Sequence, residues 1–354
     1  ATGTLDFSAK RPLIDLDVYL EEFGLSAFSP LGQDVLSSIR GTASGDFTLR
    51  GFLGNPEMEG VLRLKKAGLK FPYLNIDYNF EDEAIITLDG QSFFLEAIKL
   101  KDTKHDTKGK LQGSITHSNF KQWFLDIEIA SNNLLVLDTK NTEESLYYGT
   151  AFVKGVIDIS GLTDRLTIYA NAKTQPGTIF VVPLKDVETV DSYQLIHFKS
   201  EEIATKDRQN KIAEEALKGV SLNIDLEVTK DATAQVVIDE VSGSQLKGNG
   251  AGNLRIEINT RGKFNMFGDY TINNGVYDFK YGGIVSKPFL IQKGGTVSWN
   301  GNPTKAILDV TAIYKAKANP AVLLENFNSN RNIDVNLVTR ITGGLFSSKQ
   351  DLDI

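Results

Sequence analysis

The chain has 354 residues, a formal net charge of −7, a pI near 5.2 and no cysteine. Its 41% hydrophobic and 23% charged residues are typical of a folded protein, not of a disordered chain. The acidic balance argues against a nucleic-acid partner, which requires a basic face, and against docking on anionic headgroups through clustered Lys and Arg. Because cysteine is absent, disulfides and thiol chemistry are excluded.

No membrane-spanning helix is predicted. The unbroken apolar runs, such as residues 134–137 and 179–182, are far shorter than the roughly 18 residues that such a helix requires. The chain begins at Ala1 with neither a methionine nor a charged-then-apolar leader, and it ends inside a predicted strand. We therefore expect a piece of a longer protein, with any membrane anchor outside it.

Alternation with a period of two dominates the chain. In residues 221–230, Leu222, Ile224, Leu226 and Val228 fall on one face and polar residues on the other. In chain order, the same split recurs in residues 14–20, 125–129, 166–170, 254–258, 308–312 and 333–337. Each segment is predicted to be a strand with one dry and one wet face, as in an antiparallel sheet.

Two segments break this pattern and suggest the domain organisation. Residues 30–40 have apolar side chains at helical spacing, followed by Gly41, and are predicted to form a short helix. Residues 201–218 are rich in charge and are predicted to be a mobile or helical linker. We expect a β section over residues 1–200, containing the helix, and a second β section over residues 219–354.

Turn residues separate the predicted strands of the second section. Asn274-Gly275 predicts a tight hairpin turn, and Gly294-Gly295 and residues 300–303 predict two more. The strands between them are predicted at residues 270–272, 276–281, 289–291 with 296–299, and 306–314. The glycine-rich run 248–252 precedes a strand and not a helix, so we interpret it as a hairpin rather than a phosphate-binding loop.

No catalytic or metal site is predicted. The three histidines, His105, His117 and His197, are not spaced as metal ligands, and we expect them at the surface or at sheet edges. No Gly-x-Ser-x-Gly elbow occurs. We therefore expect neither a cofactor nor an enzyme.

Residues 268–314 contain five short blocks in a fixed order. They are Gly-Asp-Tyr, Asn-Gly-Val-Tyr-Asp-Phe, Lys-Pro-Phe, Gly-Gly-Thr-Val-Ser-Trp-Asn-Gly-Asn-Pro and Ala-Ile-Leu-Asp-Val-Thr-Ala-Ile-Tyr. This series resembles the C-terminal domain of the TamB family, which belongs to the translocation and assembly module and to the AsmA-like, bridge-like lipid transfer superfamily.

The resemblance implies a fold and a set of lining residues. The pattern alone is compatible with a barrel, a sandwich or a trough. The family implies an all-β, elongated β-taco, which is a U-shaped, mostly antiparallel meander with an apolar concave groove, here with one or two short helices. The groove is then lined by Leu166, Ile168, Leu222, Ile224, Leu226, Val228, Ile256, Ile258, Tyr270, Ile272, Leu308, Val310 and Ala312.

The resemblance also implies function and partners. The first expectation is a periplasmic bridge in a Gram-negative bacterium, anchored in the inner membrane, whose groove shields phospholipid acyl chains between the inner and outer membranes. The alternative is a scaffold that assembles outer-membrane β-barrel proteins through its strand edges, with a TamA-like, BAM-type barrel as partner. A third possibility is a structural β rod with a closed dry core.

Overall fold

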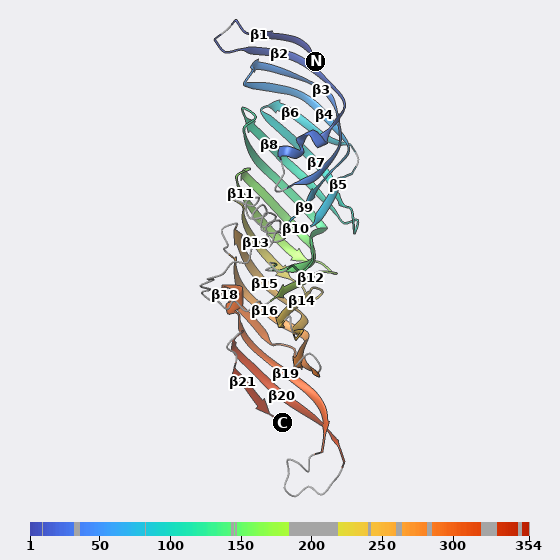
Figure 1. The fold of residues 1–354 in the computed structure, drawn as a ribbon, viewed down its shortest axis with the longest axis vertical. Helices are drawn as coiled ribbons and strands as arrows, with labels where there is room; N and C mark the ends of the chain where they lie inside the picture. The colour runs from blue at the N-terminus through green and yellow to red at the C-terminus, as the bar shows by residue number, and fades with distance from the viewer. Residues whose placement is uncertain are drawn as a thin grey trace, which may run out of the picture.

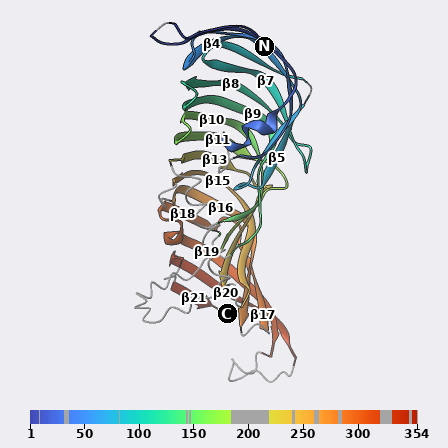
Figure 2. The same ribbon diagram turned by 45° about the horizontal axis from the view of Figure 1, so that its top comes forward.

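The strands form one long sheet. The computed structural model describes residues 1–354 except 9, 32–35, 82, 143–144, 146, 184–218, 240–241, 260–263, 282–284, 320–330, 346–348 and 354. Within this part of the chain, all the strands join in a single 21-stranded sheet (Figure 1). The sheet is long in the direction in which the strands stack, and the strands curve around that axis (Figure 2). The prediction of an all-β, elongated and U-shaped sheet is confirmed.

The elements in chain order are β1 Thr2–Asp6, β2 Leu13–Gly24, the 3₁₀ helix η1 Leu25–Leu31, β3 Ser37–Phe52, β4 Asn55–Phe71, β5 Ile76–Phe80, β6 Ala84–Gly90, β7 Ser92–Asp102, β8 Lys108–Ser118, β9 Gln122–Thr139 and β10 Tyr148–Leu162. They continue with β11 Arg165–Thr174, β12 Ile179–Pro183, β13 Ser221–Val228, β14 Thr233–Asp239, β15 Ser244–Asn259, β16 Phe264–Tyr281, β17 Val285–Ile291, β18 Thr296–Gly301, the 3₁₀ helix η2 Pro303–Lys305, β19 Ile307–Ala318, β20 Ile333–Gly344 and β21 Lys349–Asp353.

The pairing is antiparallel, as predicted, with one local exception. In that exception β11 pairs with β13 and β12 pairs with β14, and both pairings are parallel. Parallel neighbours need a crossover connection, because the chain must return to the starting end before it enters the next strand. The strands are arranged in the sheet in the order of the sequence. Their antiparallel alternation is interrupted once, in the middle of the sheet, where these two pairings are parallel.

A line of irregularities runs across the sheet from strand to strand, and we call it the bend line. Register shifts lie on it at Leu20/Phe23, Arg40/Thr42, Leu95/Ile98, Lys108/Lys110, Val153/Gly155 and Asn249/Gly250. In four other places the strand is interrupted altogether, between β5 and β6, β11 and β12, β13 and β14, and β17 and β18. Bulges bend a strand and increase its twist, so a line of them folds the sheet lengthwise.

The bend line divides the sheet into two walls. The first wall contains β1, β6, β11, β13, β18 and the adjoining halves of the long strands. The second wall contains β5, β12, β14, β17 and the other halves. In Figure 1 the labels β11, β13 and β18 lie on one side and β5, β12 and β14 on the other. Apolar side chains near the bend line, such as Ala67, Ile98 and Leu134, are only 2%, 2% and 1% exposed.

Glycine permits the close approach of neighbouring strands on the concave face. Gly113 has φ +133°, and a Cβ there would lie 2.0 Å from the carbonyl oxygen of Asp126. Gly45 has φ +154°, and its Cβ would lie 2.1 Å from the carbonyl oxygen of Val61. A larger residue is excluded at both positions by its own backbone preference and by this contact.

The helix predicted for residues 30–40 is wrong over residues 37–40, and residues 32–35 of it lie outside the described residues. The structure has the 3₁₀ helix η1 earlier, ending at Leu31, and residues 37–40 already belong to β3. Ser37 pairs with Lys70 and Arg40 with Gly68, and the Arg40 guanidinium lies 2.8 Å from the Asp77 carboxylate. Pairing with β4 overrides the weak local preference for a helix.

Two predicted turns are also wrong, and they lie opposite each other. Asn274-Gly275 falls inside the continuous strand β16, and the run 248–252 falls inside β15. Gly248 pairs with Gly275 and Asn249 with Asn274, directly beside the register shift at Gly250. These residues form part of the bend line and do not reverse the chain. The turn predicted at residues 300–303 is confirmed, because η2 connects β18 with the antiparallel β19.

Gly294-Gly295 forms a turn between β17 and β18, but these two strands do not pair with each other. Both pair with β16, so this turn is another interruption on the bend line. The predicted linker, residues 201–218, lies outside the described residues. The division into sections 1–200 and 219–354 stays a prediction.

Candidate functional site

An unbroken row of apolar residues and glycines crosses the concave face. Each member lies directly opposite the next on the neighbouring strand, and directly opposed side chains share a face. We call this set the lining row: Leu20, Gly45, Leu62, Ile86, Leu95, Gly113, Ile127, Ile159, Ile168, Leu222, Ile258 and Phe264. It contains no charged or polar side chain from β2 to β16. Most of its members are half-buried, so they present apolar surface that no part of the described chain covers completely.

The residues predicted to line the groove share this face. Their register places them with the lining row, through direct opposition or through steps of two along a strand. They differ in exposure. The half-buried members are Ile168, Leu222, Ile224, Leu226, Val228 and Ile258, and the buried ones are Leu166, Ile256, Tyr270, Ile272, Leu308, Val310 and Ala312.

Sequence reasoning missed the part of the lining that lies before β11. Leu62, Leu95, Ile127 and Ile159 belong to the same row and are half-buried. The signal was available for Ile127, because residues 125–129 alternate as clearly as those of β13. A choice of lining residues from alternation alone would have included it.

The concave face is closed along the bend line near the C-terminal end of the sheet, whereas Leu246, Tyr277 and Phe289 of the second wall stay half-buried there. The turn at Gly294 brings Gly295 against β19, so that a Cβ on Gly295 would lie 3.0 Å from Val310 Cγ1. Ala306 and Ala312 are 1% and 0% exposed, and the Leu345 amide donates a 2.9 Å hydrogen bond to the Ala306 carbonyl. The predicted lining residues of β16 and β19 therefore form an ordinary dry core.

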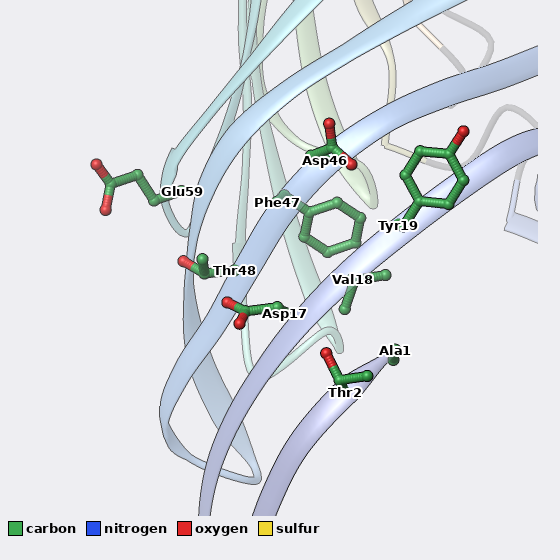
Figure 3. A pocket seen from close by; sticks show the side chains of 9 residues that line it. All are labelled: Ala1, Thr2, Asp17, Val18, Tyr19, Asp46, Phe47, Thr48 and Glu59. Carbon is green, nitrogen blue, oxygen red and sulfur yellow. The ribbon is translucent and has the colours of Figure 1, made fainter.

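A shallow hollow of about 390 Å³ lies at the N-terminal end of the sheet (Figure 3). It is lined by Ala1, Thr2, Asp17, Val18, Tyr19, Asp46, Phe47, Thr48 and Glu59. Val18 and Phe47 lie opposite each other in β2 and β3, two residues along from Leu20 and Gly45 of the lining row. The hollow thus lies beside the beginning of the apolar face. Its polar residues come from alternate positions of β2 and β3, and from β1 and β4.

Aromatic residues of the C-terminal motif contact one another across strands. Tyr277 and Phe289 are paired neighbours with ring centroids 6.2 Å apart, and Phe289 lies 5.3 Å from Tyr314. Lys287 Nζ donates a 3.1 Å hydrogen bond to the Tyr314 hydroxyl. These contacts pack the rings against one another within the sheet, which is the structural role of cross-strand aromatic pairs.

His117 does not lie at the surface, which corrects the prediction for this residue. It is 1% exposed and stacks on Phe120 with a centroid distance of 3.9 Å, and Trp123 lies 5.3 Å away. Burial lowers the pKa of His117, because the charged imidazolium loses its hydration there. His105 packs edge-on against Phe152, and His197 lies outside the described residues.

Buried Asp102 has a structural role. Its carboxylate accepts hydrogen bonds from the amides of Lys104, His105 and Thr107 at 2.9, 2.7 and 2.6 Å. Burial tends to raise the pKa of Asp102, but these bonds and the Thr107 hydroxyl outweigh burial and lower it. The residue holds the turn between β7 and β8. Across the residues that the structure describes, no three His, Cys, Asp or Glu side chains gather to hold a metal ion.

The outer face carries ion pairs between neighbouring strands as well as exposed apolar side chains, such as Val61, Phe94 and Tyr169. Arg50 and Asp15 are paired neighbours that form a 3.3 Å ion pair, and Arg255 and Asp225 form another at 3.5 Å. Both pairs are largely exposed, so each contributes little to stability. The outer face is therefore solvated and mixed in character, whereas the lining row is apolar throughout.

Comparison with known proteins identifies the family. Over the described ranges, none of the helices has the length and apolarity needed to span a membrane. No curated protein matches the chain. The TamB C-terminal domain matches residues 98–349, from within β7 to the start of β21, which is more than half of the chain. The chain therefore belongs to the TamB C-terminal domain family, a component of the translocation and assembly module of the Gram-negative envelope.

Proposed function

We propose that this chain is a section of a periplasmic bridge that shields phospholipid acyl chains on its concave face as they move between the inner and outer membranes. The groove binds lipid and catalyses no reaction. The full-length protein is anchored in the inner membrane outside this chain. The lining row, which is apolar and half-buried over many successive strands, is the observation that carries this proposal.

The physical argument starts from the half-buried lining. Apolar surface left in contact with water is unfavourable at about 25 cal/mol per Å². An acyl chain covers such a surface well, because each buried methylene contributes about 0.8 kcal/mol. A row without polar side chains offers no position at which an acyl chain is held more tightly than at the next. Movement along the groove is therefore favoured over retention at one site.

The proposal is tested by lipid extraction from the purified chain. The protein is isolated from Gram-negative cells without detergent, and its bound lipids are identified by mass spectrometry. Ile168→Arg places a charge in the lining row at a half-buried position of β11. Tyr169→Arg is the matched control, because Tyr169 is the next residue and is 55% exposed on the outer face.

We expect phospholipid with the parent and with Tyr169→Arg, and at least a tenfold loss with Ile168→Arg. Far-ultraviolet circular dichroism checks that all three chains keep their β structure. Equal, negligible lipid in the three chains would count against the proposal. Equal lipid in all three would place the lipid elsewhere than in the groove.

A second candidate function is supported by the free edges of the sheet. Within the described part of the chain, β1 pairs with β2 only over Leu13–Asp17, and β21 pairs with β20 only over Val338–Thr342. The remaining lengths of β2 and β20 have unpaired edges, and such edges accept an added strand. In this function the chain is a scaffold for outer-membrane β-barrel proteins, with a TamA-like partner. Tyr19→Pro, on the β2 edge, should weaken binding of such a partner and leave the extracted lipid unchanged.

A further inference from the structure

An aromatic contact joins the two walls of the groove. Tyr147 lies directly before β10, at the rim of the second wall. Its ring stacks on Phe180 of β12, with centroids 5.4 Å apart and planes inclined by 25°. The same ring meets Phe264 edge-on, with a centroid distance of 6.2 Å and an angle of 62°. Phe264 is the first residue of β16 and lies at the rim of the first wall.

The register shows that both partners belong to the concave face. Phe264 is the last member of the lining row and packs beside the buried Leu254, Ile256 and Met266. Phe180 lies directly opposite Ala234, which packs against the C-terminal core. The ring of Tyr147 therefore lies on the concave side, between a residue of one wall and a residue of the other.

Tyr147 is held in place at its hydroxyl end as well. Burial raises the pKa of the Tyr147 phenol, and charge interaction and a hydrogen bond with Tyr73 raise it further. Tyr73 lies between β4 and β5, also at the rim of the second wall. With its ring stacked on Phe180 and its hydroxyl bonded to Tyr73, Tyr147 is a side chain fixed to the second wall that reaches the first.

The contact lies at the boundary between the apolar cluster of the N-terminal half and those of the C-terminal half. The first cluster contains buried residues from β3 to β10, such as Leu88 and Phe152. The nearer C-terminal cluster contains Leu254, Ile256 and Met266, with Phe264 packed against it, and the farther one contains buried residues from β16 to β19 with Ala306. Thr174 and Thr178 are buried on the bend line at this boundary, beside the parallel pairing. The change in the direction of the strands and the wall-to-wall contact therefore occur at the same level of the sheet.

We propose that Tyr147, with Phe180 and Phe264, forms a crossbar that divides the groove into two compartments, and that a phospholipid passes between them only when the crossbar opens. This inference rests on the proposed lipid function. A headgroup kept at the open side of the groove meets the three rings at this level. The contact of Tyr147 with Phe264 is the one that must separate, because Phe180 and Tyr73 belong to the same wall as Tyr147.

The crossbar is tested by locking it. The natural chain has no cysteine, so Tyr147→Cys/Phe264→Cys provides two unique thiols, which a short bismaleimide joins. A photoreactive phenylalanine derivative replaces either Phe93, on the N-terminal side, or Tyr277, on the C-terminal side. Both are half-buried aromatic residues of the concave face. Cells are labelled with radioactive phosphate after cross-linking, and irradiation attaches nearby phospholipid to the reporter.

The unlocked chain should give lipid adducts at both reporters. Locking the crossbar should lower the adduct at one reporter at least tenfold and leave the other unchanged. Lys101→Cys/Asp106→Cys is the matched control, because these side chains form a 2.7 Å ion pair on the outer face and a link there leaves the groove free. Tyr147→Phe keeps the ring and should give the same adducts as the parent. Tyr147→Ala removes the ring, so labelled lipid should reach the second reporter sooner after it reaches the first.

The outcomes separate the two proposals. Unchanged adducts at both reporters of the locked chain would overturn the crossbar and leave lipid binding intact. Loss of the adduct at both reporters, with unchanged circular dichroism, would also overturn the crossbar. A locked crossbar should still let lipid enter the compartment on its own side. Absence of adducts at both reporters of the unlocked chain would overturn the lipid function itself.

Discussion

The middle and the C-terminal end of the sheet share one sequence pattern and differ in what covers it. On β11 and β13, Ile168, Leu222 and Ile224 are half-buried. On β16 and β19, Ile272 and Val310 are each 4% exposed. The difference arises where the turn at Gly294 folds against β19. Alternation thus produces an apolar face, and local closure decides whether that face is a core or an accessible lining.

A charge introduced into the two regions should give the largest difference in stability between them. Val310→Arg places a guanidinium in the dry core, and we expect the free energy of unfolding to fall by about 3–5 kcal/mol, as for an uncompensated buried charge. Ile168→Arg should cost about 1–2 kcal/mol, because the half-buried site lets the charge reach water. Urea denaturation followed by circular dichroism measures both. Equal losses would mean that the two regions do not differ in closure.

Enlarging Gly295 should open the closed end. A Cβ there meets Val310 at 3.0 Å, so Gly295→Val forces the turn away from β19, and we expect a loss of about 1–3 kcal/mol for overpacking. The matched control is Gly54→Val, because a Cβ at Gly54 has no neighbour within 4 Å. Binding of a hydrophobic dye should rise in Gly295→Val and stay constant in the control. A dye signal that does not change would contradict closure by this turn.

Acid should loosen the sheet near His117, on the N-terminal side, and leave β16–β19 unaffected. Because burial lowers the pKa of His117 from its ordinary 6.5, the unfolded chain binds the proton first as pH falls. The stability contributed by the neutral imidazole is present above pH 6.5 and is lost from there down to the lowered pKa. Hydrogen exchange at pH 7.5 and 5.5 should show faster exchange at the tip of β8 and β9. His117→Phe should remove this pH dependence, and exchange that quickens equally in β19 would argue against a local origin.

The smallest effect is expected at Tyr270. Its hydroxyl is buried and has no hydrogen-bond partner among the described residues, and burial raises the pKa of Tyr270 to about 12. Tyr270→Phe removes an unsatisfied polar group, so stability should stay constant or rise by about 1 kcal/mol. Urea denaturation measures it. A loss above that size would reveal a partner for the hydroxyl and a more polar C-terminal core than the structure shows.

The strands and their faces could be predicted from the sequence because they depend on period-two alternation. The residues predicted on one face of β13 and of β19 do share one face by their register, and their role in lining a groove stays a prediction. The helix at residues 30–40 could not be corrected from the sequence, since apolar residues at its spacing also fit an irregular strand paired with β4. The candidate site was found in part, because alternation does not report how much of a face is covered.

The sequence could not decide which glycine-containing runs reverse the chain. Asn-Gly and glycine-rich runs are compatible with a chain reversal or with a bulge, since both need a permissive backbone. The structure pairs Asn249 with Asn274, and so converts two apparent hairpins into one step of the bend line. Only the pairing partners distinguish these outcomes.

The sequence by itself determined that this chain is a β protein with one apolar face and that its C-terminal motif resembles the TamB family, because both depend on the order of residues along the strand. The tertiary structure decided where the sheet bends, where its strands run parallel, and where Tyr147 meets Phe264 across the walls. These features depend on contacts between residues far apart in the chain, which local preferences do not specify.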